Sequence, residues 1–321
     1  MKAWQVHVLG EPQDVLVLAD VPEPVAGPDQ LRVRVDAVAL NFPDILMCRG
    51  TYQERPPLPF TPGLEVCGTV LDGPRAGQRV IGGPVLPHGG MAEQVLLPTA
   101  GAFTVPAGMP AAKAAGLMIT YQTGYVGLHT RCHLQAGETL LVHAGAGGVG
   151  TAAIQLGKAA GARVIATAGG AAKTRVCRDL GADVVVDYDS EDFVAVVKDA
   201  TDGRGADVIY DPVGGDVTDK SRRCIAFEGR LLIVGFAGGR IADIPANHAL
   251  VKNYAVLGLH WGLYRTHGPH VITQTHEALV GLYEQGLIDP LIGAELPLSD
   301  GPAALARLAD RGTVGKVVLL P

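Results

Sequence analysis

The stretch TLLVHAGAGGVGTAAIQL (139–156) places four glycines within six positions, between an apolar run and a segment with helical character. These are Gly145, Gly147, Gly148 and Gly150. Glycine loses more conformational freedom on folding than any other residue, so such a cluster indicates backbone that must stay free of side chains. Gly145, Gly147 and Gly150 form the pattern G-x-G-x-x-G where a strand is expected to end and a helix to begin.

Alternating strand and helix patterns surround this motif. Strands are expected at 139–144, 163–168, 183–188, 206–211, 230–236 and 255–261. Apolar strands that alternate with helices indicate a parallel sheet covered on both faces. Six strands in this order match a complete doubly wound dinucleotide fold, and we therefore predict a Rossmann domain over residues 122–261.

The expected helices carry their own start and stop signals. Two of them, VGTAAIQLGKAAG and AAKTRVCRDLGA, run into Gly161 and Gly181, which we expect to end them. A third, SEDFVAVVKDAT, begins at Ser190, where an N-cap is expected.

Within such a fold each glycine of the motif has a task. The tasks are a tight turn, close approach of the backbone to a pyrophosphate, and tight packing of helix on strand. The N-terminus of the helix adds free N–H groups and a partial positive charge. We predict that Gly145, Gly147, Gly148, Val149 and Gly150 bind a dinucleotide; a purely structural strand–helix turn is the alternative.

The turn after the second strand indicates which dinucleotide is bound. An NAD site needs an acidic residue there to accept a hydrogen bond from the ribose 2′-OH. The segment ATAGGAAKTR (166–175) has no Asp or Glu and carries Lys173 and Arg175 instead. Added cations without a carboxylate favour a 2′-phosphate, which predicts NADPH. The alternative is that Lys173 is a solvated residue in the first turns of the helix.

The regions on either side of the Rossmann pattern are organised differently. The first 110 residues are rich in Pro and Gly, with strand patterns at 31–40, 79–83 and 92–98. The last segment holds two helical patterns, THEALVGLYEQG and PAALARLADRG, and a closing strand KVVLL. Because that strand can pair with an edge strand of the first domain, we expect one discontinuous domain made of residues 1–121 and 262–321.

Composition excludes several classes of protein. Hydrophobic residues make up 48% of the 321 and charged residues 18%, which permits a large core and argues against disorder. The net charge of −6, with no block of like charges, argues against nucleic acid or a membrane as the main partner. Five scattered cysteines without a CxxC pair suit a reducing cytosol, and the N-terminus has no apolar signal core. We expect a cytoplasmic protein.

Several segments together match one family. They are ALNFPDILMCRGTY (39–52), PFTPGLEVCGTV (59–70), AGQRV (76–80), HAGAGGVG (143–150), TAGGAAK (167–173), VVDY (185–188), YDPVGG (210–215) and GKVVLL (315–320). On these segments the whole chain resembles the zinc-independent, zeta-crystallin-like quinone oxidoreductases of the medium-chain dehydrogenase/reductase superfamily. The resemblance implies an α/β protein with a GroES-like β-rich catalytic domain and a Rossmann domain that binds NADPH. It also implies a homodimer that pairs through the last Rossmann strand (255–261).

The resemblance assigns roles to single residues. Asn41 and Tyr52 match catalytic positions beside the nicotinamide and the substrate, and Gly169, Lys173 and Tyr188 match contacts to the 2′-phosphate. The remaining matches to cofactor-binding positions are Thr123, Val213, Gly214, Phe236, Gly238 and Lys316. Leu46 and Pro43 depart from the family pattern, so the substrate pocket is expected to be more apolar than in some relatives.

We expect no metal. Where zinc-dependent members of the superfamily carry zinc ligands, this chain has Asn41 and Gly63-Leu64-Glu65, and leucine cannot bind zinc. Two histidine clusters are candidates for a metal site: His129, Cys132 and His133, and His260, His267 and His270. Neither has an evident third or fourth ligand elsewhere, so ordinary polar or packed histidines are favoured.

Without zinc, an alcohol is difficult to oxidise because nothing lowers its pKa. An electron-poor acceptor is a better substrate, so the resemblance and the chemistry both favour NADPH-dependent reduction of a quinone. Tyr52 or solvent would supply the proton. Two alternatives stay open: an enoyl or 2-alkenal reductase of the same fold, and a non-enzymatic, crystallin-like protein that binds cofactor or RNA. The physiological substrate and the number of electrons transferred are also open.

Overall fold

The structure, a computed structural model, describes residues 1–321, and the chain divides into two compact units. Unit 1 comprises Met1–Ile119 and Pro290–Pro321, and unit 2 comprises Thr120–Asp289. Unit 1 is therefore assembled from both ends of the chain.

The division differs from the expected bounds over residues 262–289, which belong to unit 2. At the end of this segment, the side-chain amide of Gln155 makes two hydrogen bonds to the backbone of Asp289. Gln155 Nε2 donates to Asp289 O at 3.0 Å, and Asp289 N donates to Gln155 Oε1 at 2.5 Å. The end of the segment that holds α9 (Tyr264–His267) and α10 (Pro269–Glu284) is thus bonded within unit 2.

Unit 2 is built on a six-stranded parallel sheet, which confirms the predicted fold class. Its order is β10-β9-β8-β11-β12-β13, so the strand order reverses between β8 and β11. The strands are β8 (Thr139–Val142), β9 (Arg163–Ala168), β10 (Val184–Asp187), β11 (Ala206–Asp211), β12 (Ile225–Ile233) and β13 (Ala255–Gly258). In doubly wound folds, ligands bind outside the carboxyl ends of the strands at such a reversal.

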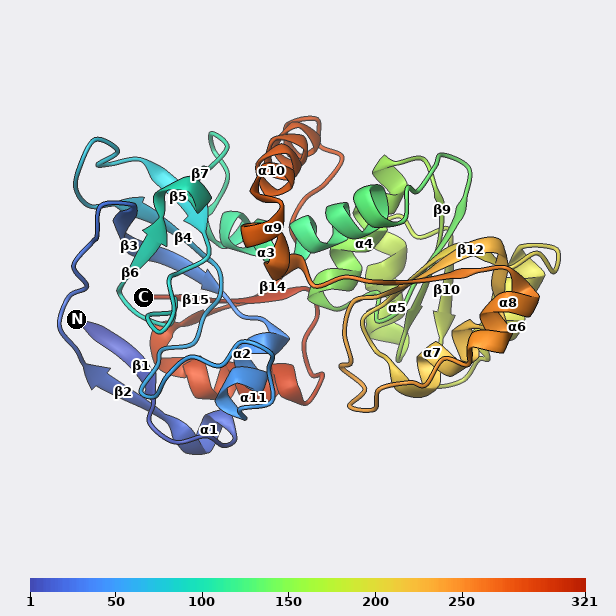
Figure 1. Ribbon diagram of the computed structural model, residues 1–321, viewed down its shortest axis with the longest axis horizontal. Coiled ribbons are helices and arrows are strands. Elements are labelled where there is room, and N and C mark those ends of the chain that lie inside the picture. The colour runs from blue at the N-terminus through green and yellow to red at the C-terminus, as the bar shows by residue number, and fades with distance from the viewer. The chain divides into compact units, whose positions relative to one another are not determined.

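Helices lie around this sheet (Figure 1). They are α4 (Gly148–Ala159), α5 (Ala171–Asp179), α6 (Phe193–Ala200), α7 (Gly215–Ser221) and α8 (Ala246–Lys252). Gly161 and Gly181 follow the ends of α4 and α5 with positive φ angles of 76° and 93°, as expected for helix-ending glycines. The expected N-cap at Ser190 is wrong. Asp192 caps α6 instead, because its carboxylate is close enough to accept from Val194 N.

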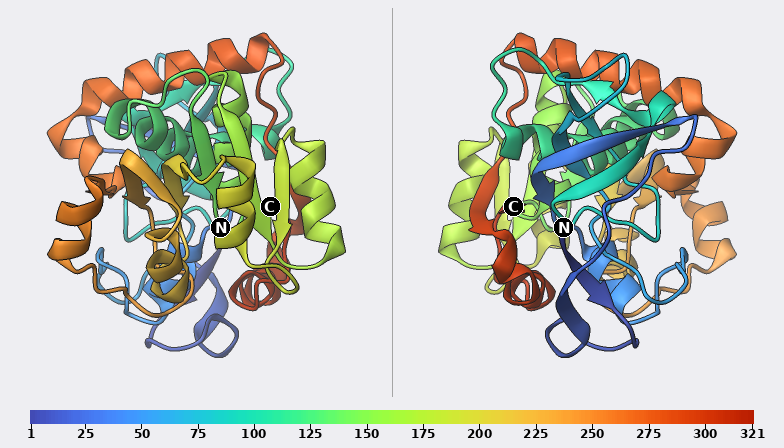
Figure 2. Two further views of the ribbon diagram at one scale, coloured as in Figure 1. Left: turned by 90° about the vertical axis from the view of Figure 1, so that its right-hand side faces the viewer. Right: turned by 90° about the vertical axis from the view of Figure 1, so that its left-hand side faces the viewer.

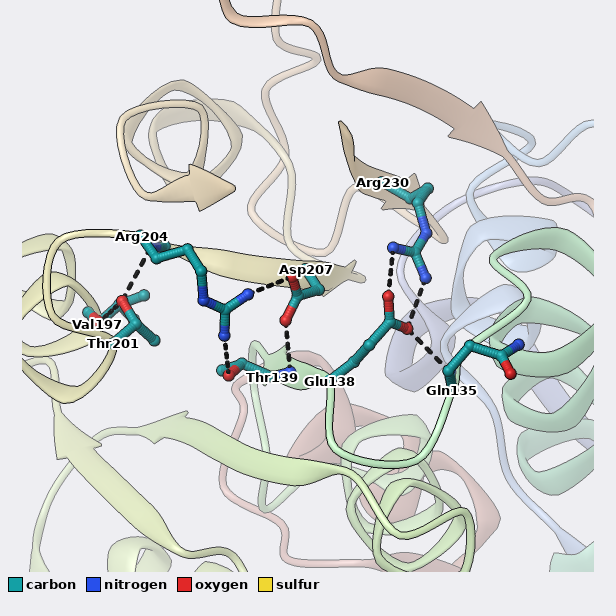
Figure 3. A network of polar contacts seen from close by, with 9 residues as sticks. Gln135, Glu138, Thr139, Val197, Thr201, Arg204, Asp207 and Arg230 are labelled. Atoms are coloured by element: carbon teal, nitrogen blue, oxygen red, sulfur yellow. Dashed lines mark hydrogen bonds and ion pairs between the residues drawn. The ribbon is translucent and has the colours of Figure 1, made fainter. Parts of the chain in front are cut away.

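A network of hydrogen bonds and ion pairs connects residues near the amino ends of the strands of this sheet (Figure 3). Arg230 donates two hydrogen bonds to the carboxylate of Glu138, at 2.8 and 2.7 Å, and a third to Cys132 O. Asp207 accepts from Thr139 N at 2.7 Å and from Arg204. This network, which we call the amino-end network, lies at the edge opposite to the glycine motif.

Unit 1 contains a seven-stranded sheet with the order β14-β15-β3-β4-β5-β7, to which β6 adds through β3. The strands are β3 (Gln30–Ala39), β4 (Val66–Val70), β5 (Arg79–Gly82), β6 (Gln94–Pro98), β7 (Phe103–Thr104), β14 (Ile292–Pro297) and β15 (Lys316–Leu320). The helices assigned to it are α1 (Pro12–Val15), α2 (Phe42–Cys48) and α11 (Gly301–Ala309), and α3 (Ala111–Tyr125) runs through the point where the units divide. β1 (Lys2–Val6) and β2 (Leu16–Asp20) form a separate ribbon, dark blue in Figure 2.

The closing strand pairs as predicted. β15 is antiparallel to β3, with Val318 opposite Ala39. β3 is an interior strand rather than an edge strand, because it also pairs with β4. Unit 1 is therefore completed by the last residues of the chain.

No helix combines the length and the apolar character that crossing a bilayer requires.

Candidate active site

The glycine turn follows β8 and is shaped by backbone contacts. A Cβ atom on Gly150 would lie 2.1 Å from Ala144 O, and one on Gly145 would lie 2.8 Å from Cys177 Sγ. Both positions therefore exclude side chains for reasons of packing. A Cβ atom on Gly147 would lie 3.3 Å from its nearest neighbour, Ala144 O, so packing within the chain excludes a side chain there far less strongly than at Gly145 or Gly150. A glycine at that position leaves the backbone open to a ligand, as a dinucleotide cradle requires.

Helix α4 begins directly after this turn. Gly147 is its N-cap, and no side chain caps the helix. Gly147, Gly148 and Val149 are half-exposed, whereas residues 150–157 of α4 are buried. The uncapped N–H groups and the helix dipole make this end suitable for a phosphate.

The turn after β9 brings Gly169 and Tyr188 together. A Cβ atom on Gly169 would lie 2.8 Å from the ring of Tyr188, so the phenol packs directly over bare backbone. Lys173 stands in the first turn of α5, half-exposed. The carboxylate of Asp187, at the end of β10, accepts from Gly170 N at 2.9 Å and thereby fixes the turn. Sequence reasoning missed this role of Asp187, although the VVDY segment contains it.

The loops after β11 and β12 contact each other. Gly238 N donates to Val213 O at 2.8 Å, and a Cβ atom on Gly214 would lie 2.9 Å from the ring of Phe236. Asp211 is buried and holds the first loop, because one of its oxygens accepts from Val213 N and Gly214 N at 2.8 and 3.0 Å. Asp211 is thus a loop-positioning residue that the sequence analysis did not single out.

In unit 1, Asn41 is the N-cap of α2 and is fixed by a buried carboxylate. Asp44 accepts from Asn41 N at 2.7 Å and, with its other oxygen, from Gly63 N at 2.9 Å. Gly63 has φ = +106°, and a Cβ atom there would meet Met91 N at 2.7 Å. Burial raises the pKa of Asp44 to about 6, so the carboxyl is largely ionised above that pH.

The side chain of Asn41 belongs to a buried ionic network with Lys316 and Glu65. Lys316 Nζ donates to Leu40 O at 2.8 Å and to Asn41 Oδ1 at 2.7 Å, and it forms an ion pair with Glu65 at 2.6 Å. Asn41 Nδ2 donates to Ala39 O at 3.1 Å and to Glu65 Oε1 at 2.9 Å. Both amide hydrogens of Asn41 and all three ammonium hydrogens of Lys316 therefore have acceptors within unit 1.

The other oxygen of Glu65 accepts from Ile119 N at 2.6 Å, within α3. Glu65 is fully buried, and Lys316 is 3% exposed. The charge of each group is compensated by the other, as a buried ion pair requires. A substrate carbonyl, which can only accept, would have to replace one of these bonds in order to bind to the amide hydrogens of Asn41 or to the ammonium of Lys316.

Tyr52 and the residues that depart from the family pattern lie in or near α2. Tyr52 is half-buried and packs against the apolar core of unit 1. Pro43 lies in the first turn of α2, where a missing N–H costs nothing. Leu46, on the same helix, is half-buried. The proton-donating role expected for Tyr52 stays a prediction.

The two histidine clusters that were candidates for a metal site form no ligand set. No three His, Cys, Asp or Glu side chains converge in a way that would hold a metal ion. His129 lies in the π-helix that follows α3 (Val126–Arg131), and its ring packs against that of Tyr125 with the ring centres 4.4 Å apart. All five cysteines are free and buried.

The predicted site residues thus fall into groups within each unit. In unit 2 the glycine turn, the Gly169–Tyr188 pair and the Val213–Gly238 pair all follow the carboxyl ends of parallel strands. Thr123 is buried on α3, and no side-chain hydrogen bond joins it to these turns. In unit 1, Asn41 and Lys316 are bonded to each other, although 275 residues separate them.

This fold and these turns define a two-domain dehydrogenase/reductase. Residues 27–107 match the alcohol dehydrogenase GroES-like domain, and residues 148–278 match the zinc-binding dehydrogenase family.

Individual relatives narrow the class. A quinone oxidoreductase-like protein 2 homolog from Nematostella vectensis is 40% identical over 301 residues, which are 91% of this chain and 82% of the relative. The quinone oxidoreductase from Thermus thermophilus, solved also in complex with NADPH, is 34% identical with a TM-score of 0.88 over 100% of both chains. A 2-haloacrylate reductase is 28% identical with a TM-score of 0.85, over 100% of this chain and 99% of that one. The chain belongs to the quinone oxidoreductase family of the medium-chain dehydrogenase/reductase superfamily and is an oxidoreductase.

Proposed function

We propose that this protein reduces quinones with NADPH, without a catalytic metal. The choice of NADPH over NADH rests on the turn after β9. The sequence has no Asp or Glu between Arg163 and Arg178, and it places Lys173 there. The ring of Tyr188, which follows β10, packs over Gly169 of this turn. Solved relatives bound to NADPH support the same choice. The phosphates would be held by the N-terminus of α4 and the glycine turn.

The metal-free part of the proposal rests on the donor set in unit 1. The oxygens of Asn41 and Glu65 face the ammonium of Lys316, so a fixed organic cation already neutralises the buried carboxylate of Glu65. Without a Lewis acid, the acceptor itself must be electron-poor, which favours a quinone over an alcohol or a simple carbonyl.

Bound NADPH would supply a hydride to the acceptor. The chain's own contribution is orientation. In unit 1, Lys316 and Glu65 hold the amide of Asn41, and Asp44 holds the start of α2. In unit 2, a backbone hydrogen bond holds the loops at Val213 and Gly238 together. Tyr52 carries a phenolic O–H that can donate a proton to the reduced product, as can solvent.

A second candidate is reduction of an activated carbon–carbon double bond. The similarity to a 2-haloacrylate reductase favours it, because that name describes a double bond conjugated to a carboxylate. The two reactions share the cofactor and the metal-free requirement, and they differ only in the acceptor.

Steady-state oxidation of NADPH tests these proposals. The acceptors are 1,4-benzoquinone and a naphthoquinone beside an enone, a 2-haloacrylate and an enoyl thioester. We expect turnover with the quinones and at least tenfold lower kcat/KM with the others. The reverse order would establish the double-bond reductase, and NADPH binding without any turnover would favour a non-enzymatic role.

We propose further that the protein is a cytoplasmic homodimer joined through β13. This strand ends the parallel sheet and is paired on one side only. Exposed apolar side chains accompany it: Phe227, Leu250, Val251 and Val256 are 69%, 74%, 75% and 39% exposed. An unpaired edge with an apolar surround is suited to pairing with a second copy.

A further inference from the structure

A buried histidine immediately before the glycine turn has no role in the chemistry proposed above. His143 follows the last residue of β8 and is 1% exposed. Its Nδ1 lies 3.0 Å from Thr167 Oγ1, and its Nε2 lies 2.8 Å from Ser221 Oγ. The ring also packs edge-on against Phe193, with the ring centres 4.8 Å apart.

The hydrogen bonds determine the tautomer of His143. Ser221 donates its one hydroxyl hydrogen to Val217 O at 2.7 Å, because a carbonyl oxygen can only accept. Ser221 Oγ must then accept from His143, so Nε2 carries the hydrogen. In a neutral ring Nδ1 is the acceptor, and Thr167 Oγ1 donates to it.

The partners of His143 lie on the elements that carry the three cofactor turns. His143 itself precedes the glycine turn, and Thr167 is two residues before Gly169. Ser221 ends α7, the helix that starts after the Val213 loop. Backbone bonds reinforce these links: His143 N donates to Tyr210 O at 3.1 Å, and Gly145 N donates to Thr167 O at 2.8 Å.

We infer that His143 is a positioning residue for the dinucleotide site. As a neutral Nε2–H imidazole it fixes the glycine turn, the turn after β9 and the loop after β11 relative to one another. The expected consequence of this role, tighter binding of NADPH, rests on the proposed function. The geometric role itself is independent of the cofactor.

Three variants and a matched control test this role. His143→Leu removes both hydrogen bonds, Thr167→Val removes only the donor to Nδ1 while keeping the side-chain shape, and His143→Gln keeps an N–H donor for Ser221. Arg230→Met is the control, since it breaks the amino-end network in the same unit at the other ends of the strands (Figure 3).

Hydrogen–deuterium exchange of the ligand-free proteins is the first measurement. In the His143→Leu and Thr167→Val variants we expect at least fivefold faster exchange at the three turns, with a smaller increase in His143→Gln. In Arg230→Met the faster exchange should be confined to the amino ends of the strands. The peptides to follow are 144–150, 167–173 and 213–221 for the turns, and 132–139 for the control.

Titration with NADPH is the second measurement. We expect its Kd to rise at least tenfold in Thr167→Val and to stay within twofold in Arg230→Met, even where both variants lose similar thermal stability. Unchanged exchange at the three turns in Thr167→Val and His143→Gln, or equal exchange there in the control, would overturn the inference. If exchange responds as expected but the native protein binds no NADPH, the positioning role stands and the proposed function fails.

Discussion

The side chain of Lys316 is only 3% exposed, and each of the three hydrogens of its ammonium group has an acceptor within the protein. Removing one partner of a buried ion pair is strongly destabilising, because the other partner is left as an uncompensated charge. Glu65 depends on Lys316 in the same way, because its carboxylate is fully buried. The pair therefore acts as one unit that orients Asn41.

Lys316→Met should destabilise the protein by about 3–5 kcal/mol, because it leaves the carboxylate of Glu65 buried without a counter-charge. Adding Glu65→Gln should recover part of this loss, since the amide is neutral and its oxygen can still accept from Ile119 N. Urea unfolding of both variants measures the effect. A double variant that is as unstable as the sum of its single changes would contradict it.

Lys173 is expected to read the 2′-phosphate. Lys173→Glu should raise the Kd for NADPH at least tenfold and that for NADH less than threefold, because only NADPH carries the group that the new carboxylate repels. Fluorescence titration with both cofactors measures this. Arg178→Glu is the control, since it makes the same change of charge at an exposed position of α5. Equal effects on both cofactors in Lys173→Glu would refute the assignment.

His143 makes stability depend on pH. Burial lowers its pKa from 6.5 to about 4, and the nearby carboxylate of Asp211 opposes this only in part. Above pH 6.5 the ring is neutral in both the folded and the unfolded chain. As the pH falls from 6.5 towards 4, only the unfolded chain takes up the proton, so the free energy of unfolding decreases.

The full loss amounts to about 3 kcal/mol, because one pKa unit is worth about 1.4 kcal/mol. Chemical denaturation at pH 7.5, 6 and 4.5 measures it, with His143→Gln as the reference. The gap in stability between the two proteins should narrow as the solution becomes more acidic. A gap that stays constant would show that the imidazole is not held neutral.

Single elements also have functions that can be tested. Strand β13 is short and lies at the edge of the sheet, with Val256 39% exposed. A lysine at an edge discourages strand pairing, since its charge would have to be desolvated.

Val256→Lys should convert the proposed dimer to a monomer without unfolding it. Light scattering coupled to gel filtration gives the mass directly. Val25→Lys, at a valine of unit 1 that is 87% exposed, should leave the mass unchanged. If the native protein is already a monomer at micromolar concentration, the proposal of a dimer joined through β13 is wrong.

At the scale of the whole molecule, binding of cofactor should raise thermal stability. A ligand that binds only the folded state at 100 times its Kd stabilises that state by about 2.7 kcal/mol. We therefore expect a rise in Tm of a few degrees with NADPH, and a smaller rise with NADH at the same concentration. Differential scanning calorimetry measures both. Equal shifts would argue against selection of the 2′-phosphate.

The sequence alone determined the parts of this protein that depend on local pattern. Apolar strands alternating with helices predicted the six-stranded sheet, and Gly161 and Gly181 ended their helices as expected, because backbone geometry and side-chain period act over a few residues. The motif at Gly145–Gly150 predicted the turn for the same reason. The N-cap of α6 was misplaced by two residues, since Ser190 and Asp192 offer equivalent oxygens and only the folded turn selects one.

Only the tertiary structure decided which polar groups meet inside the molecule. Asn41 and Lys316 are 275 residues apart, and His143 and Ser221 are 78 apart. Such pairs carry no periodic signal, because their approach depends on how whole strands and helices are ordered in the sheet. Burial then makes each pairing compulsory, since an unpaired polar group away from water costs far more than a hydrogen bond gains.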